Sequence, residues 1–395
     1  MMRKIVRKAV LAISAAAILL LGTVGWLSES LPDTFYVSDP AVFSLPRYEM
    51  LSVEQETVLP ASKGDIALAG QAELKLGGVV PVKTVSLQKT QRRYLVPCGT
   101  PFGLKMTTEG VLVVGLSPVE TNSGTVCPAQ TAGIQKGDII TAANGQQLTS
   151  FQQLAQQVSA GEPVELSVNR EGATFSLSVV PVLSASGSYQ CGIWGRDSSA
   201  GIGTVTFYDP ATGMFGGLGH GVCDADTGSL MPLAEGDILP ASILDVVPGT
   251  VGTPGELRGT FSSGFSIGTM LKNTSCGVFG LMRLSPSSNE PMEVGQKQEV
   301  FSGPAQILVT TIGEKPVLYD IEIEKVNYSD TPTRNMILRV TDSDLLAVTG
   351  GIVQGMSGSP ILQNGKLIGA VTHVLVNDPT RGYGIFIENM LDAAG

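Results

Sequence analysis

The sequence contains little charge and very little histidine. Of its 395 residues only 15% are Asp, Glu, Lys or Arg, and the net charge is −10. No dense run of Lys and Arg occurs beyond the N-terminus, which argues against nucleic acid as a partner. The five cysteines form no C-x-x-C pair and the only histidines are His220 and His373, so we find no zinc-ligand set and expect no metal or other cofactor.

Glycine and proline are plentiful by contrast, with 48 and 23 residues. Hydrophobic residues make up 43% of the chain, so sizeable cores can form. Short runs of Val, Ile and Thr separated by Gly, Pro and Asn are typical of strands joined by turns. The length allows two or three domains, and we expect them to be mainly β.

The N-terminus predicts a membrane anchor, residues 1–27. Four basic residues within positions 3–8 precede an uncharged run over 9–27. Nineteen residues can cross a bilayer as a helix at about 1.5 Å per residue. The basic flank places the rest of the chain outside the cytoplasm. A cleaved signal peptide is the alternative, but no convincing small-x-small site follows the run, so an uncleaved anchor is favoured.

A juxtamembrane segment, residues 28–94, follows the anchor. Its runs Ile66–Leu76 and Val79–Val85 predict strands of a small sheet. No residue pattern in it indicates chemistry.

Residues 95–183 combine three features in order: the segment Pro101-Phe102-Gly103-Leu104, a G-I-x-x-G-D-x-I motif at 133–140, and a helix from Phe151 with Ser150 as its N-cap. This set resembles a PDZ domain. The resemblance implies that Pro101, Phe102, Gly103 and Leu104 form the carboxylate-binding loop, and that a peptide adds as a strand between the segment after it and the helix. Residues 184–203, rich in Ser and Gly, are expected to be a linker.

The motif G-x-S-G-S-P at 355–360 precedes a strand-like pair, an Asn-Gly turn and a further apolar run. Glycines on both sides of Ser357 allow a sharp bend, and the N–H groups of Gly355 and Ser357 could then face a developing oxyanion. The motif resembles the nucleophile loop of chymotrypsin-like serine proteases, so we expect residues 204–395 to form a double β-barrel peptidase domain. A surface Gly/Ser turn is the alternative.

A serine nucleophile needs a base, and a third group usually orients that base. His220 lies in a glycine-rich bend, whereas His373 lies on the strand after the nucleophile hairpin, so His220 is the better candidate. Spacing alone leaves the acid open. The candidates are Asp342, Asp224, Asp226, Asp237 and Asp245.

Taken together, the anchor, the PDZ-like domain, Gly219-His220-Gly221, Val340-Thr341-Asp342, residues 350–360 and the tail at 370–379 resemble the stage IV sporulation protein B (SpoIVB) family. The resemblance implies a triad of His220 as base, Asp342 as the group that orients it, and Ser357 as nucleophile. The chain order agrees with chymotrypsin-like enzymes, but their acid lies much nearer the histidine.

The resemblance also implies a biological setting. Such proteases enter the space between the two membranes of the developing spore, cleave themselves, and then cut a membrane-associated regulator, which activates sigma-factor processing. Self-cleavage, which would release the catalytic part, is expected here within Val42–Gln55. Two alternatives are a non-catalytic PDZ scaffold outside the cytoplasm and a general envelope quality-control protease, in whose family the PDZ domain follows the protease domain.

His373 supports one further hypothesis. Viral chymotrypsin-like proteases that cut after Gln carry a similar nucleophile loop and a later histidine that contacts the substrate side chain. We therefore expect His373 to line the pocket for the residue before the scissile bond and to favour an amide or carboxylate there. An ordinary packed strand histidine is the alternative.

Overall fold

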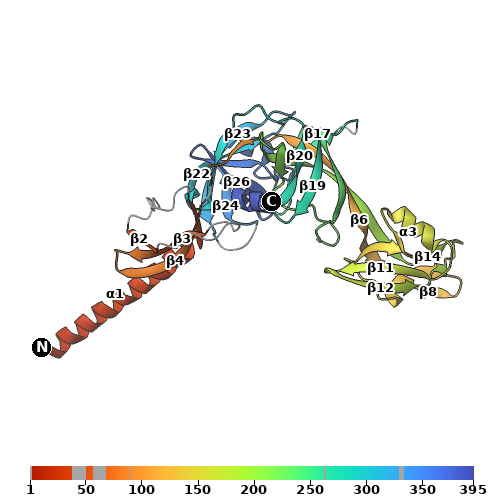
Figure 1. Ribbon diagram of the computed structural model, residues 1–395, viewed down its shortest axis with the longest axis horizontal. Helices are drawn as coiled ribbons and strands as arrows, with labels where there is room; N and C mark the ends of the chain where they lie inside the picture. The colour runs from red at the N-terminus through yellow and green to blue at the C-terminus, as the bar shows by residue number, and fades with distance from the viewer. Residues whose placement is uncertain (1, 38–49, 57–67, 90, 262–263, 329–332) are drawn as a thin grey trace.

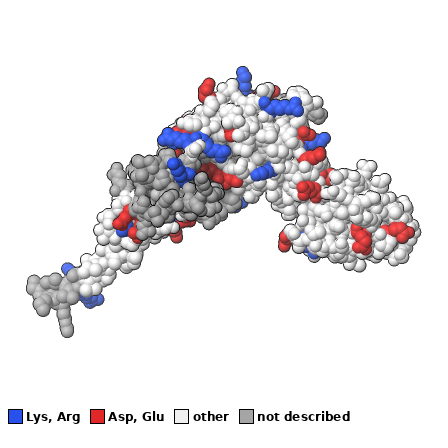
Figure 2. Space-filling model, viewed as in Figure 1, with Lys and Arg blue, Asp and Glu red and all other residues white. Residues whose placement is uncertain are grey.

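The computed structural model describes residues 2–37, 50–56, 68–89, 91–261, 264–328 and 333–395. Figure 1 shows an elongated molecule in which helix α1 (Met2–Ser30) projects at one end and a small α/β lobe lies at the other. A larger β body, which holds the C-terminus, lies between them. On the face shown in Figure 2, charged side chains of both signs are scattered, with no large area of one sign.

Helix α1 is long and apolar enough to cross a membrane. Its segment Val10–Glu29 has a mean hydropathy of 2.2, and 6% of the window is buried; a signal sequence would share these features. The helix leads into a four-stranded sheet in the order β1-β4-β3-β2. Lys83 of this sheet donates to the carbonyls of Ser28 and Leu31, which fixes the end of the helix to the sheet. The strands are β1 (Thr34–Val37), β2 (Leu51–Glu56), β3 (Leu68–Leu76) and β4 (Val80–Lys89).

The central body consists of two closed barrels. In the first, each strand pairs with the next in the order β6, β15, β16, β20, β19, β17 and back to β6. Its core contains Phe102, Val205, Phe215 and Val278. The strands are β6 (Pro101–Leu116), β15 (Ile193–Tyr208), β16 (Met214–Gly217), β17 (Leu233–Val247), β19 (Gly268–Thr274) and β20 (Gly277–Met282).

The second barrel closes in the order β22, β25, β26, β27, β24, β23 and back to β22. Strand β5 (Tyr94–Pro97) pairs with β15 of the first barrel and with β21 (Met292–Val294), which pairs with β26. The expected mainly β fold with a chymotrypsin-like double barrel is therefore confirmed. The strands are β22 (Gly303–Val309), β23 (Val317–Val326), β24 (Met336–Val340), β25 (Pro360–Gln363), β26 (Lys366–Leu375) and β27 (Asp378–Phe386).

The PDZ-like unit is inserted into the first barrel. The first half of β6 pairs with β15 and β17 of the barrel, and its second half pairs with β9 and the start of β15 in the PDZ-like unit. Both long strands thus serve two cores. The other main elements of the unit are α2 (Pro128–Thr131), β9 (Ile139–Ala143), α3 (Phe151–Val158), β11 (Val164–Arg170) and β12 (Ala173–Val179). As expected, Ser150 caps α3 by accepting a hydrogen bond from Gln153 N.

The structure draws the domain boundaries differently from the sequence. The expected linker, 184–203, contains strand β14 (Tyr189–Gln190) and most of β15. Its glycines permit close packing: a Cβ on Gly203 would lie 2.2 Å from Leu218 Cδ2, and one on Gly195 would lie 2.5 Å from the Phe151 ring. The peptidase domain also extends beyond 204–395, because its first barrel needs β6.

This topology predicts that the fragment 204–395 does not fold. Without β6, strands β15 and β17 lose their shared partner, and the first barrel is left with two open edges. The fragment 94–395 keeps both barrels and should unfold cooperatively. Thermal unfolding followed by circular dichroism compares the two, and a cooperative transition in 204–395 would contradict the shared-strand topology.

Candidate active site

Ser357 lies on a tight bend between α4 (Ser343–Thr349) and β25, where the backbone conformation favours glycine. Gly355 and Gly358 have φ angles of +95° and +98°, which L side chains rarely adopt. A Cβ on Gly358 would lie 2.2 Å from the carbonyl oxygen of Thr204 and 2.6 Å from Leu218 N. The loop of the second barrel therefore packs directly against the backbone of the first.

Two threonines of β15 hold this loop. Thr204 Oγ1 donates to the carbonyl of Gly355 at 2.8 Å, and Thr206 Oγ1 donates to the carbonyl of Gly358 at 2.7 Å. Thr206 is fully buried. Sequence reasoning missed both residues, because a threonine inside an apolar strand carries no distinguishing signal.

His220 follows a strained turn at the end of β16. Leu218 and Gly219 both have a φ of +66°, which is uncommon for leucine. Leu218 N donates to the Thr204 carbonyl, so the same residue of β15 contacts the serine loop and the histidine turn. Local strain of this kind is often found at functional sites.

The imidazole of His220 is in the state that a general base needs. Its Nδ1 lies 2.9 Å from the carbonyl oxygen of Gly221. Because a carbonyl can only accept, this contact places the proton on Nδ1 and leaves Nε2 free to accept one. Burial lowers the pKa of His220 below its ordinary value, with the Gly221 hydrogen bond acting in the opposite direction. The ring is therefore neutral at pH 7.

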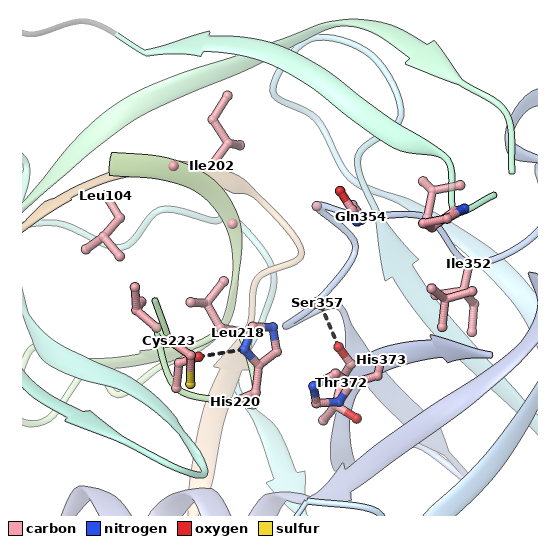
Figure 3. A pocket seen from close by; sticks show the side chains of 18 of the residues that line it. Leu104, Ile202, Leu218, His220, Cys223, Ile352, Gln354, Ser357, Thr372 and His373 are labelled. Carbon is pink, nitrogen blue, oxygen red and sulfur yellow. Dashed lines mark hydrogen bonds between the residues drawn. The ribbon is translucent and has the colours of Figure 1, made fainter. Parts of the chain in front are cut away.

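His220, Ser357 and His373 line one cavity of about 480 Å³ (Figure 3). The cavity lies between the two barrels, and most of its other side chains are apolar. They include Leu104, Ile202, Leu218, Pro254, Ile352 and Val374. In this structure Ser357 Oγ donates to the carbonyl of Thr372 at 2.6 Å, so the hydroxyl must rotate before it can donate to His220.

The two imidazole rings lie close together at a tilt. Their centroids are 4.9 Å apart, with an angle of 36° between the ring planes. Desolvation, together with the nearby His220 and Arg334, lowers the pKa of His373 to about 4. His373 is therefore neutral at pH 7, so it would not oppose a positive charge on His220.

Among the described residues, the two predicted oxyanion donors have no hydrogen-bond acceptor in the protein. Within the described ranges, the N–H groups of Gly355 and Ser357 donate to no other residue. The neighbouring N–H groups do have acceptors: Met356 N donates to Val353 O, and Gly358 N to Val371 O. The loop thus leaves two backbone donors beside the nucleophile available for a ligand.

Asp342 is placed differently from the expected triad. It is the N-cap of α4 (Ser343–Thr349), and its carboxylate accepts hydrogen bonds from the N–H groups of Asp344, Leu345 and Asp320. The Leu345 N–H contributes most to lowering the pKa of this carboxyl. Asp342 does not line the cavity, and its carboxylate is hydrogen-bonded to backbone rather than to His220.

The other candidate acids lie outside the cavity as well. Asp224 and Asp226 pair with Arg196, and Asp237 and Asp245 lie on β17. No carboxylate lines the cavity among the described residues. The acceptor at His220 Nδ1 is instead the Gly221 carbonyl. Nor do three His, Cys, Asp or Glu side chains cluster as metal ligands anywhere in the described part of the chain.

The prediction that Pro101–Leu104 form the carboxylate-binding loop is wrong. These residues form the start of β6 and pair with Gly201–Thr204 of β15 on one side and with β17 on the other. Phe102 and Leu104 are buried in the first barrel. Backbone groups already paired on both sides cannot receive a peptide strand.

The structure brings a different segment, Cys191-Gly192-Ile193, to the position beside α3. Gly192 has a φ of +77°, and a Cβ there would lie 2.2 Å from the carbonyl of Ser117. In the described chain the N–H groups of Cys191 and Gly192 donate to no other residue. Beyond this turn β15 runs past α3, where Asp197 accepts a hydrogen bond from Phe151 N at 2.8 Å. In the sequence, the two glycines Gly192 and Gly195 were the one available indication that this segment packs closely beside α3.

The position of Asp342 generates a sharp prediction. Asn caps helices about as well as Asp, so Asp342→Asn should keep most of the activity. If Asp342 oriented His220, the same change would lower kcat about 10⁴-fold. Asp342→Ala should lower the free energy of unfolding by about 1 kcal/mol and reduce activity, because α4 leads directly into the serine loop. Kinetics and thermal unfolding of the two variants decide between the roles.

Comparison with known proteins agrees with this geometry. A family model described as SpoIVB peptidase S55 matches residues 187–391, and one described as PDZ domain matches residues 123–170. A curated relative from Pasteurella multocida (strain Pm70), named "Putative zinc metalloprotease PM1991", is 41% identical over 78 residues. That match covers 20% of this chain and only 16% of the relative.

Among solved structures, the HtrA-type protease AlgW with decapeptide aligns with 76% of this chain and 64% of its own, at 9% identity. The TM-score of 0.31 is too low to support an argument. The peptidase match, however, spans more than half of the 395 residues and includes His220, Ser357 and His373. The chain belongs to the SpoIVB peptidase S55 family.

Proposed function

We propose that this chain is a serine endopeptidase that cleaves itself and then a membrane-associated regulatory protein in the space between the two membranes of the developing spore, as a signal that activates sigma-factor processing. The observation that supports the peptidase activity most directly is the convergence of Ser357 and His220, from different barrels, on one cavity. Family membership supports the signalling role.

In the proposed mechanism, Ser357 turns from the Thr372 carbonyl and gives its proton to His220 Nε2 while Oγ attacks the peptide carbonyl. The N–H groups of Gly355 and Ser357 stabilise the oxyanion; one such donor is typically worth about 2.7–4 kcal/mol of the barrier. His220 then protonates the leaving amine, and water hydrolyses the acyl-enzyme. The Gly221 carbonyl, which accepts from Nδ1, stabilises the positive ring as a carboxylate does in other enzymes.

Location follows from the N-terminus. With the basic residues within positions 3–8 kept in the cytoplasm, α1 would anchor the peptidase and hold both barrels on the opposite side. The proposed cleavage window, Val42–Gln55, lies partly outside the described residues, which resume at Met50. Leu51–Gln55 belong to β2 and pair with β3. A protease binds extended, unpaired chain, so a cut within Leu51–Gln55 would first require β2 to separate from β3.

Self-cleavage provides the first test. Residues 28–395 are purified as wild type and as Ser357→Ala, and their masses are followed over time by mass spectrometry. The wild type should lose an N-terminal segment, and the variant should stay intact. If neither shortens and a serine-directed fluorophosphonate leaves Ser357 unlabelled, the non-catalytic PDZ scaffold becomes the better interpretation.

The PDZ-like unit is proposed to bind a peptide along β15 rather than after Leu104. Over residues 193–199, β15 has β6 as its ladder partner, and in the described chain no strand covers its other edge, beside α3. A peptide could add to this edge, with its carboxylate at the N–H groups of Cys191 and Gly192. The unit's insertion inside the first barrel also differs from the quality-control alternative, in whose family the PDZ domain follows the protease.

His373 is proposed to read the side chain before the scissile bond. It is the main polar ring besides His220 in a largely apolar cavity, and it lies on β26, the second strand after Ser357. Cleavage of a peptide library by wild type and by His373→Ala tests this role. A preference for an amide or carboxylate should weaken in the variant, and an unchanged profile would leave His373 as a packing residue.

A further inference from the structure

Arg196 joins the PDZ-like unit to the loop that follows His220. It lies on β15 opposite Leu112 of β6, in the part of the strand that belongs to the PDZ-like unit. Its guanidinium pairs with the carboxylate of Asp224, and its Nη2 lies 2.8 Å from Asp226 Oδ2. Both acids belong to the loop between His220 and β17, so one side chain connects two functional parts of the molecule.

Asp224 is the centre of that loop. Its side chain is fully buried, and its Oδ1 accepts hydrogen bonds from Asp226 N, Thr227 N and Thr227 Oγ1 at 2.8–3.1 Å. Burial alone would raise the pKa of Asp224, but the Thr227 hydrogen bonds and the Arg196 charge together hold it below its ordinary value. The carboxylate is therefore ionised, and Arg196 supplies its counter-charge.

The loop is also fixed at both ends. Asn273 of β19 accepts a hydrogen bond from Val222 N at 2.8 Å and donates to the carbonyls of Val222 and Met231 at 2.9 Å. Gly221 directly precedes the fixed Val222, so a change in the loop that Arg196 holds at its centre can be passed to the Gly221 carbonyl. That carbonyl is the acceptor for His220 Nδ1.

Strand β15 continues from this ion pair to the catalytic cavity. Residues 193–199 form the proposed peptide-binding edge, residues 199–203 line the cavity, and Thr204 holds the serine loop. Arg196 lies within the peptide-binding edge, three residues before the part of the strand that lines the cavity. Its side chain is 36% exposed, so the pair with the fully buried Asp224 remains within reach of a ligand on the edge.

We propose that Arg196 is a positioning residue for His220, through which the PDZ-like unit and any peptide bound to it control the catalytic base. This inference rests on the proposed function only for its consequence for catalysis. The positioning itself is a property of the loop and can be measured without activity.

The chain offers a matched control. Arg170 makes the same kind of pair with Asp138, whose side chain is also fully buried, but both residues lie within the PDZ-like unit. Arg170→Gln should therefore destabilise the PDZ-like unit without changing the pKa of His220. Arg196→Gln removes the counter-charge from Asp224 and should loosen the His220 loop. Arg196→Lys restores the charge and should recover part of the effect.

The test is a histidine NMR titration of the full chain in detergent micelles, in a Ser357→Ala background that prevents self-cleavage. The only two histidines are His220 and His373, and His373→Ala assigns their signals. The charged or titratable groups near the rings are His373 itself, Arg334 and Cys223, and none is altered in the test variants. Arg196→Gln should move the His220 pKa upward toward 6.5, as water reaches the ring, whereas Arg170→Gln should leave it unchanged.

Fluorophosphonate labelling of Ser357 in the active chain gives the second readout. Ser357 of Arg196→Gln should be labelled roughly ten- to a hundredfold more slowly, as expected for a displaced catalytic group. The acid limb of the pH profile of its labelling rate should move to higher pH. An unchanged His220 titration in Arg196→Gln would overturn the inference whatever the activity. A shifted titration in a chain that is never labelled would uphold the positioning role and count against the proposed function instead.

Discussion

The active site depends on one close backbone contact between the two barrels. At Gly358 the serine loop approaches the Thr204 carbonyl so closely that a Cβ would lie 2.2 Å from it. That carbonyl also accepts the N–H of Leu218, which begins the turn to His220. A single residue of β15 thus contacts both the Ser357 loop and the turn that leads to His220, the proposed nucleophile and base. These contacts are made by backbone rather than by flexible side chains, so the geometry tolerates little variation.

Strand β15 also explains why the PDZ-like unit cannot be treated as a separate module. The strand begins at the proposed peptide edge, passes Arg196, lines the cavity and ends in the first barrel. Strand β6 makes the same passage in the opposite direction. The peptidase family match begins at residue 187 and so includes β15 but not β6, although the barrel cannot close without β6.

Asp342 shows how one residue can satisfy a sequence pattern in two physical ways. Its separation from Ser357 along the sequence agrees with the family's triad. The same separation agrees with a capped helix followed by a glycine turn. A carboxylate that accepts several backbone hydrogen bonds at a helix N-terminus is already well stabilised in its charged form. The Gly221 carbonyl, a group invisible to sequence reasoning, takes the position at His220 Nδ1.

The sequence by itself determined those features that depend on a few consecutive residues: the glycine-flanked Ser357, the bend at His220, the Ser150 cap and the apolar N-terminal helix. Backbone angles, capping and hydropathy act locally, so their signals survive in the sequence. Only the tertiary structure decided that Pro101–Leu104 belong to a barrel, that Gly192 adjoins α3 and that Arg196 reaches Asp224. Strand partners are distant in sequence, so no local pattern specifies them. One long strand can also pack into two different cores, and the sequence does not show into which core each half of the strand packs.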